Sequence, residues 1–115
     1  MQIKRIKLDF VLEKGIQIQN QVNFFCKQMN KEKVDTEVME KIKVQNKDTL
    51  EKFFEYYTEI AEFIKSLDDP LDKKILAMRY LALHRLDDIA KQIETPISVV
   101  GQRIEKVLDT LGGED

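Results

Sequence analysis

Apolar side chains recur at steps of three or four residues through most of the chain, and this spacing constrains the fold more than any other feature. The first series contains Leu8, Val11, Ile18, Val22, Phe25 and Met29, with Gly15 in the one vacant position. A period of about 3.5 residues is typical of helices that pack side by side. A strand over residues 3–8 is a weaker alternative, because its apolar residues do not alternate cleanly. The sequence therefore predicts an all-α fold.

The second series predicts one long helix. Its members are Val38, Ile42, Gln45, Thr49, Phe53, Tyr56, Ile60, Phe63 and Leu67. They imply a helix of about 30 residues, or ~45 Å at 1.5 Å per residue. Asp35 or Thr36 can cap its start, because either side-chain oxygen accepts from a free backbone N–H. The polar turn at 30–33 is short, so residues 1–66 are expected to form a long antiparallel helical hairpin.

Residues 67–115 predict a unit of three shorter helices, packed with the hairpin as one body. Asp69–Pro70 is a strong helix start, because the carboxylate caps and proline suits the first turn. A short helix follows over 87–93. The last helix is expected to begin at Thr95–Pro96, with Thr95 as its cap, and to end at Gly112–Gly113. Its inward positions are Val100, Ile104, Val107, Leu108 and Leu111.

Residues 64–111, IKSLDDPLDKKILAMRYLALHRLDDIAKQIETPISVVGQRIEKVLDTL, resemble region four of bacterial sigma factors, a helix–turn–helix domain. The matching positions are Leu67, Ile75, Leu76, Arg79–Tyr80, Ile89–Ala90, Ile93, Val100, Arg103, Ile104, Val107 and Leu111. A helical N-terminal half followed by one such domain is similar to the small ArpU/RinA-type transcriptional regulators of Gram-positive phages. The resemblance implies binding to double-stranded DNA, control of late phage genes and, as a further expectation, contact with RNA polymerase.

Four turn and cap positions depart from the region-four pattern. Leu83 and Glu94 stand where the family usually has glycine, and Glu94 is strained if its φ is positive. Arg85 replaces Ser or Thr, and arginine has no acceptor with which to cap a helix. Pro96 replaces serine. Asp87 is a candidate cap in place of position 85, as Thr95 is in place of position 96.

The resemblance places positions 98–103 in the major groove of DNA. Gln102 can then read adenine, and Arg103 can read guanine or bind a phosphate. The candidate phosphate contacts are Ser98, Lys106, Lys91 and Arg85. The carboxylates of Glu105, Asp109, Asp87 and Asp88 would repel phosphate if they faced it. Four or five phosphate contacts give a salt slope of only about −4, so a lone module should bind weakly.

The charge distribution motivates an alternative function. The net charge is −2, and residues 66–115 carry 7 Lys and Arg against 10 Asp and Glu. DNA-binding domains often have a basic excess instead. The alternative is a protein-binding modulator or inhibitor of a host protein, RNA polymerase among them, built on a degenerate helix–turn–helix scaffold. Phe54 and Tyr57 are the candidate partner surface, which is also the candidate surface of a homodimer.

Enzyme motifs are absent from the sequence. There is no glycine-rich phosphate loop, no HExxH motif and no pair of cysteines. His84 and Cys26 are the single residues of their kinds, so neither predicts a metal site or a catalytic group. We expect no enzymatic activity, no cofactor and no metal. The lone cysteine, and the lack of a membrane-spanning apolar run or signal peptide, predict a cytoplasmic protein without membrane contact.

Overall fold

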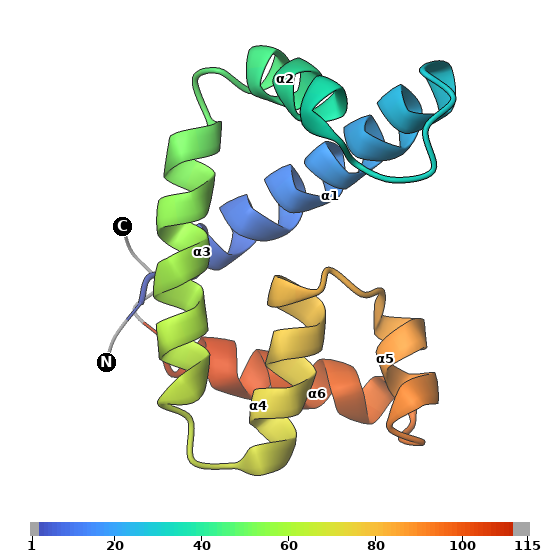
Figure 1. The fold of residues 1–115 in the computed structure, drawn as a ribbon. Coiled ribbons are helices and arrows are strands. Elements are labelled where there is room, and N and C mark those ends of the chain that lie inside the picture. Colours follow the sequence, from blue (N-terminus) through green and yellow to red (C-terminus); the bar gives the residue numbers. More distant parts are fainter. Residues whose placement is uncertain (1–2, 112–115) are drawn as a thin grey trace.

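A computed structural model of the chain describes residues 3–111, and every regular element in that range is helical (Figure 1). The elements are α1 (Arg5–Gln28), α2 (Thr36–Gln45), α3 (Leu50–Lys65), α4 (Pro70–Leu76), the π-helical turn η1 (Ala77–Leu81), α5 (Leu86–Gln92) and α6 (Ile97–Asp109). The all-α prediction is confirmed, and the strand alternative for residues 3–8 is wrong because α1 begins at Arg5. The prediction that Gly112–Gly113 ends the last helix is wrong, because α6 ends at Asp109 with Thr110 as its C-cap residue. The two glycines themselves lie outside the described residues.

The predicted second helix of the hairpin is wrong, because a turn at residues 46–49 divides it into α2 and α3. Asn46 is buried there, and its side-chain amide donates to Gln21 Oε1 at 2.7 Å and to the Ile42 carbonyl at 2.8 Å. Residues 47–49 are polar, so a continuous helix through them would bury no additional apolar side chain. As a result α2 packs on the C-terminal half of α1, while α3 crosses its N-terminal half (Figure 1).

Gly15 marks a close crossing and not a break in α1. It is buried, and a Cβ atom placed on it would lie 2.8 Å from Leu83 Cδ1 and 3.4 Å from Phe53 Cε1. Only a residue without a side chain lets Leu83 approach the α1 backbone this closely. Nearby, the Tyr57 hydroxyl donates to the Leu81 carbonyl at 3.0 Å. The first half of the chain therefore contacts the second through α1 and α3 together.

One hydrophobic core runs through both halves of the chain. Its fully buried side chains are Leu8, Val11, Ile60, Ile75, Leu76, Ile89 and Val100. Val38 on α2 is also fully buried but lies outside this core. On α6, Val100, Ile104, Val107 and Leu108 are buried and Leu111 beyond it is half-buried, as the spacing predicts. Burying these positions fixes which side of α6 faces outward.

The predicted caps are right for two helices and wrong for the last. Asp35 accepts from Val38 N at 3.0 Å, and Asp69 accepts from Leu71 N at 2.8 Å. At α6 the N-cap is Pro96, and the Thr95 hydroxyl donates instead to the Ile93 carbonyl at 3.1 Å. Proline has no side-chain acceptor, so α6 begins without a side-chain cap.

The replacement cap predicted for α5 is also not formed. Arg85 is the N-cap residue and makes no side-chain cap bond, while Asp87 lies inside the first turn. The Asp87 carboxylate accepts from the next backbone N–H, that of Asp88, at 3.0 Å. The two carboxylates in the first turn still favour this helix start, because negative charge complements the N-terminal end of the helix dipole.

Three helix ends close on residues with left-handed backbone, namely Asn30 (φ 58°), Leu83 (φ 61°) and Glu94 (φ 52°). At the end of α5, Thr95 N donates to the Ala90 carbonyl at 3.0 Å, which wraps the chain around Glu94. Such a closing turn usually takes glycine at the left-handed position. The resemblance to region four implies glycine at positions 83 and 94, and both Leu83 and Glu94 have the left-handed conformation that glycine tolerates best.

Replacing Glu94 with glycine is expected to stabilise the fold. Glu94 is exposed, so no packing is lost, and relief of the left-handed backbone strain is worth about 1 kcal/mol. Thermal or urea unfolding of Glu94→Gly measures the gain. Gln92→Gly, at an exposed helical position two residues earlier, is the matched control and should destabilise. Equal losses in both variants would contradict a strained turn at Glu94.

Candidate nucleic-acid interface

The outward face of α6 is the surface that the sequence analysis singled out. With Val100, Ile104 and Val107 buried, the exposed side chains of this helix include Ser98, Gln102, Glu105, Lys106 and Asp109. Ser98 and Gln102 are one helical turn apart and project from the same side. The first two turns of α6 therefore present an uncharged polar stripe, and charged residues begin at position 103.

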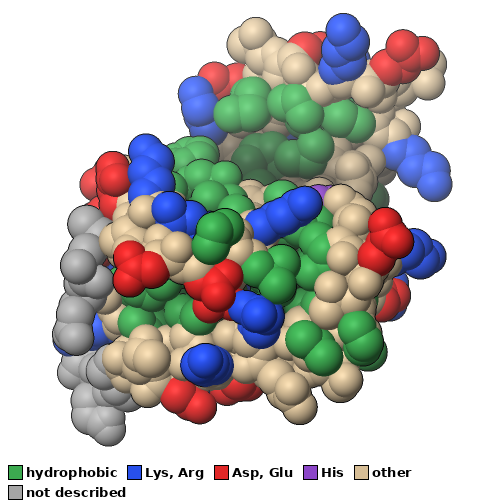
Figure 2. All heavy atoms as spheres, turned by 90° about the horizontal axis from the view of Figure 1, so that it is seen from below, with side chains coloured by type: hydrophobic (Ala, Val, Ile, Leu, Met, Phe, Trp, Pro, Cys, Tyr) green, Lys and Arg blue, Asp and Glu red, His purple; other side chains and the backbone are tan. Residues whose placement is uncertain are grey.

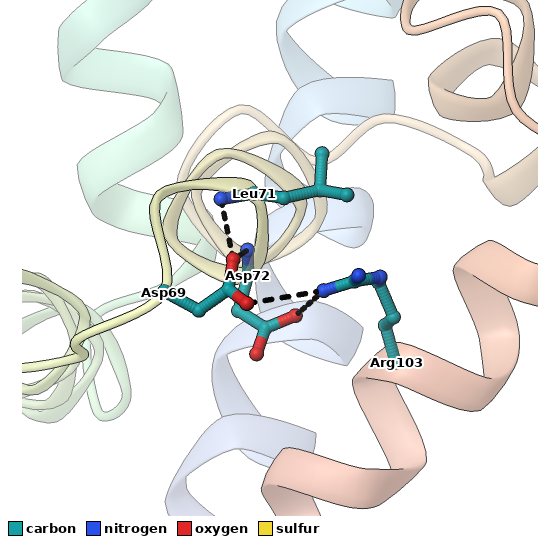
Figure 3. A network of polar contacts seen from close by, with 4 residues as sticks. All are labelled: Asp69, Leu71, Asp72 and Arg103. Atoms are coloured by element: carbon teal, nitrogen blue, oxygen red, sulfur yellow. Dashed lines mark hydrogen bonds and ion pairs between the residues drawn. The ribbon is translucent and has the colours of Figure 1, made fainter.

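Arg103 on α6 lies against the start of α4, with its side chain 35% exposed (Figure 3). Its Nη1 donates to Asp72 Oδ1 at 2.9 Å and to Asp69 Oδ2 at 3.5 Å. Asp69 also caps α4 by accepting from Leu71 N and Asp72 N. These two backbone N–H groups, and then Arg103, lower the pKa of Asp69. The hydrogen bond to Asp72 leads the effects that raise the pKa of Arg103.

Arg5 reaches the other flank of α6 from the first turn of α1. Its Nη2 lies 3.1 Å from Glu105 Oε2, and its Nη1 lies 3.7 Å from Asp109 Oδ1. Both carboxylates are well exposed, so each pair adds little stability by itself. Their effect is on charge, because Arg5 offsets two carboxylates that follow the positions expected to contact DNA. No periodicity in the sequence tells which distant helix Arg5 reaches.

Two hollows border the exposed stripe of α6. The larger has a volume of about 410 Å³ and lies between α1, η1 and α6, with Arg5, Arg79, Ser98, Gly101 and Gln102 among its lining residues. The smaller, about 300 Å³, is lined by Asp69, Asp72, Val99, Gln102, Arg103 and Lys106. Gln102 lines both hollows and therefore lies between them on the outward face of α6.

The six predicted DNA-contact residues lie on two elements. Ser98, Gln102 and Lys106 come together on the exposed side of α6, while Arg103 turns toward α4. The other two, Lys91 and Arg85, are exposed on α5 and at its N-cap, where Arg85 Nε lies 3.2 Å from Asp87 Oδ1. Seen from below, the molecule has Lys and Arg interspersed with Asp and Glu, without an extended basic patch on that side (Figure 2).

The two predicted partner-contact residues differ in exposure. Phe54 is 54% exposed, although its ring packs edge-to-face on that of Phe53 at 5.5 Å. Tyr57 is half-buried and uses its hydroxyl to join α3 to η1, so it serves an internal contact. Other exposed apolar side chains were not predicted, among them Phe24 on α1 (55% exposed) and Val44 on α2 (74% exposed). Their signal in the sequence is weak, because a surface apolar residue and a core residue look alike in a periodic series.

No site for a metal ion is apparent among residues 3–111, since no three His, Cys, Asp or Glu side chains cluster there. His84 contributes its backbone carbonyl to the fold, accepting from Arg79 Nη1 at 3.0 Å. In the same part of the chain, every helix is too short or too polar to cross a lipid bilayer.

Comparisons with known proteins give no match: a scan against protein-family models, a search of curated proteins and a search of solved structures each find nothing similar to this chain.

The two capping carboxylates are expected to make the fold acid-sensitive. The pKa of Asp69 is lowered from 3.8 chiefly by the backbone N–H groups that it caps. The pKa of Asp35 is lowered first by the hydrogen bond from Lys31 and then by its capping bond from Val38 N. Their stabilising contribution is therefore complete above pH 3.8 and is lost as the pH falls through the lower folded-state values. In Asp69→Asn the side-chain oxygen still caps α4 but no longer titrates.

Thermal unfolding across acidic pH measures this effect. The midpoint of Asp69→Asn should fall less steeply with decreasing pH than that of the wild type, and Asp35→Asn/Asp69→Asn should be flatter still. Parallel curves for all three proteins would contradict the role given to these carboxylates.

Proposed function

We propose that this protein is a small transcriptional regulator of phage type, which binds double-stranded DNA through a helix–turn–helix formed by α5 and α6. The observation that carries the proposal is the backbone of Leu83 and Glu94. These residues stand at the two turn positions where region four of sigma factors usually has glycine, and both have positive φ. A left-handed residue at each position supports a region-four-like path for the chain despite the change of side chain.

In this proposal the first two turns of α6 enter the major groove. Gln102 is the leading candidate for base contact, because it is exposed and an amide can bond adenine with both its donor and its acceptor. Ser98 and Lys106 on the same side are suited to phosphates. Lys91 and Arg85, both exposed, would extend these contacts along the DNA backbone.

Arg103 takes a different role from the one its sequence position suggests. Its guanidinium already bonds Asp72 and lies within 3.5 Å of Asp69, so a base contact would require it to leave two carboxylates. A planar guanidinium has five donors and can keep Asp72 while offering another N–H to a phosphate. We therefore assign Arg103 to the edge of the interface, beside Lys106 in the smaller hollow.

The balance of charge implies weak binding by one copy. Of the two cations of α6, Arg103 is paired with Asp72 and Asp69 at the start of α4. The α6 carboxylates Glu105 and Asp109 are paired with Arg5 of α1, so the interface has few positive charges in excess for phosphate contacts. Each phosphate contact changes the salt slope by about 0.9, so few contacts give a low affinity together with a shallow dependence on salt. A second copy of the chain, or contact with RNA polymerase, would supply the remaining affinity, with exposed Phe54 as the candidate surface.

Substitution of Gln102 and Lys106 separates the two kinds of DNA contact. Short duplexes selected from a randomised pool with the wild-type protein serve as the specific probe. Gln102→Ala should weaken binding to selected duplexes by about tenfold and leave binding to unselected duplexes nearly unchanged. Lys106→Ala should weaken both equally and reduce the salt slope by about 1.

Lys41→Ala is the control, because Lys41 is an exposed lysine on α2 and not on the proposed interface. If the wild type enriches no duplex and binds none at low salt, the proposal of DNA binding is wrong. If Gln102→Ala affects selected and unselected duplexes alike, the assignment of base contact is wrong.

A second candidate function is a protein-binding modulator of a host protein. The observation that favours it is the carboxylate set around α6, in which Asp69, Asp72, Glu105 and Asp109 all lie within 4 Å of an arginine. Mixed charges held in pairs are more typical of a protein-facing surface than of a phosphate-facing one. Under this function α6 or Phe54 would meet a protein surface.

Titration with purified bacterial RNA polymerase tests this second candidate. Stoichiometric binding that is weakened by Phe54→Ala, in a protein that binds no DNA at low salt, would favour the modulator. Binding to DNA without binding to polymerase would contradict it.

A further inference from the structure

Gly101 lies in the interior of α6 without any requirement for glycine from the fold. No glycine among residues 3–111 has positive φ, so its backbone conformation is open to any residue. A Cβ atom placed on Gly101 would meet nothing within 4 Å. Gly15 differs, because a Cβ there would press against Leu83. Glycine is a poor helix former, so glycine at position 101 makes the helix less stable than alanine would. The absence of a side chain there allows no closer packing inside the protein that would offset this loss.

The open space beside Gly101 is the larger hollow, of about 410 Å³. Arg5 and Arg79 contribute positive charge to its lining, and Asp9 and Glu105 contribute an equal negative charge. Arg5 is paired with Glu105, and Arg79 Nη1 donates a hydrogen bond to the backbone carbonyl of His84. The lining is therefore rich in hydrogen-bonding groups but has no net charge.

This chemistry fits base edges better than phosphates. A phosphate needs an excess of positive charge, which the paired groups do not provide. The edges of base pairs in the major groove are uncharged and offer donors, acceptors and the thymine methyl group. Ser98 and Gln102, which border Gly101 in the same hollow, have matching hydroxyl and amide groups.

We propose that Gly101 is the point of closest approach between α6 and DNA, where base edges contact the helix backbone beside Gln102. The inference rests on the proposed function and adds a residue to it. Any side chain at position 101 would stand between the helix and the base pairs, so binding requires glycine although folding does not. Substitution of this residue should therefore move stability and DNA binding in opposite directions.

The experiment compares Gly101→Ala and Gly101→Leu with the wild type in thermal unfolding and in binding to the selected duplexes. Gly101→Ala should raise the unfolding midpoint by about 3–6 °C, because alanine is the better helix former and its Cβ meets nothing. The same change should weaken binding to selected duplexes about tenfold, and Gly101→Leu should weaken it further. Asn23→Ala, at an exposed position of α1, is the matched control: it should stabilise the helix and leave DNA binding unchanged.

The outcomes separate this inference from the function on which it rests. If the wild type binds selected DNA and Gly101→Ala binds it equally well, the inference is overturned and the proposed function stands. If Gly101→Ala loses stability, folding does require glycine and the inference is also overturned. If the wild type binds no DNA, both fail, and a loss of polymerase binding in Gly101→Ala would assign the hollow to a protein instead.

Discussion

Leu83 packs against the backbone of α1 at Gly15, and this close approach is one of the contacts that join the two halves of the chain. The leucine is held at φ 61°, a conformation that costs an L-residue about 1–2 kcal/mol. Its side chain fills the space over Gly15 beside Phe53. Glu94 has the same backbone strain but is exposed and gains no packing. The two left-handed residues are thus similar in conformation and opposite in consequence.

The contact between the halves also determines what α6 can present. With the core fixed by α1, α4 and α6, the start of α1 lies beside the C-terminal part of α6, where Arg5 meets Glu105 and Asp109. On the other side, Arg103 meets the start of α4. The stretch between these ion pairs is uncharged and contains Gly101. In this stretch the neighbouring charges are paired and the helix backbone at Gly101 is accessible. Such a surface favours short-range hydrogen bonds to a partner over long-range electrostatic attraction to it.

Prediction from the sequence succeeded where the physics is local. The inward positions Val100, Ile104 and Val107 follow from helical periodicity, and Asp69 caps α4 because its carboxylate needs only the next turn. It failed where a distant partner decides. A periodic series from Val38 to Leu67 continues through residues 46–49, but the amide of Asn46 bonds Gln21 on α1 and the helix is divided there. Thr95 was expected to cap, yet its hydroxyl bonds Ile93 and α6 begins at Pro96.

The sequence by itself determined that the chain is helical and which face of α6 is buried. Both depend on neighbours a few residues away, so spacing and side-chain chemistry suffice, whereas the turns at Leu83 and Glu94 were indicated only by the resemblance to region four. Only the tertiary structure decided that Arg103 bonds Asp72 and that Arg5 pairs with Glu105. It also decided that Leu83 occupies the space over Gly15, while Gly101 faces open space. These are contacts between residues up to a hundred positions apart, and their partners are selected by the packing of the whole core.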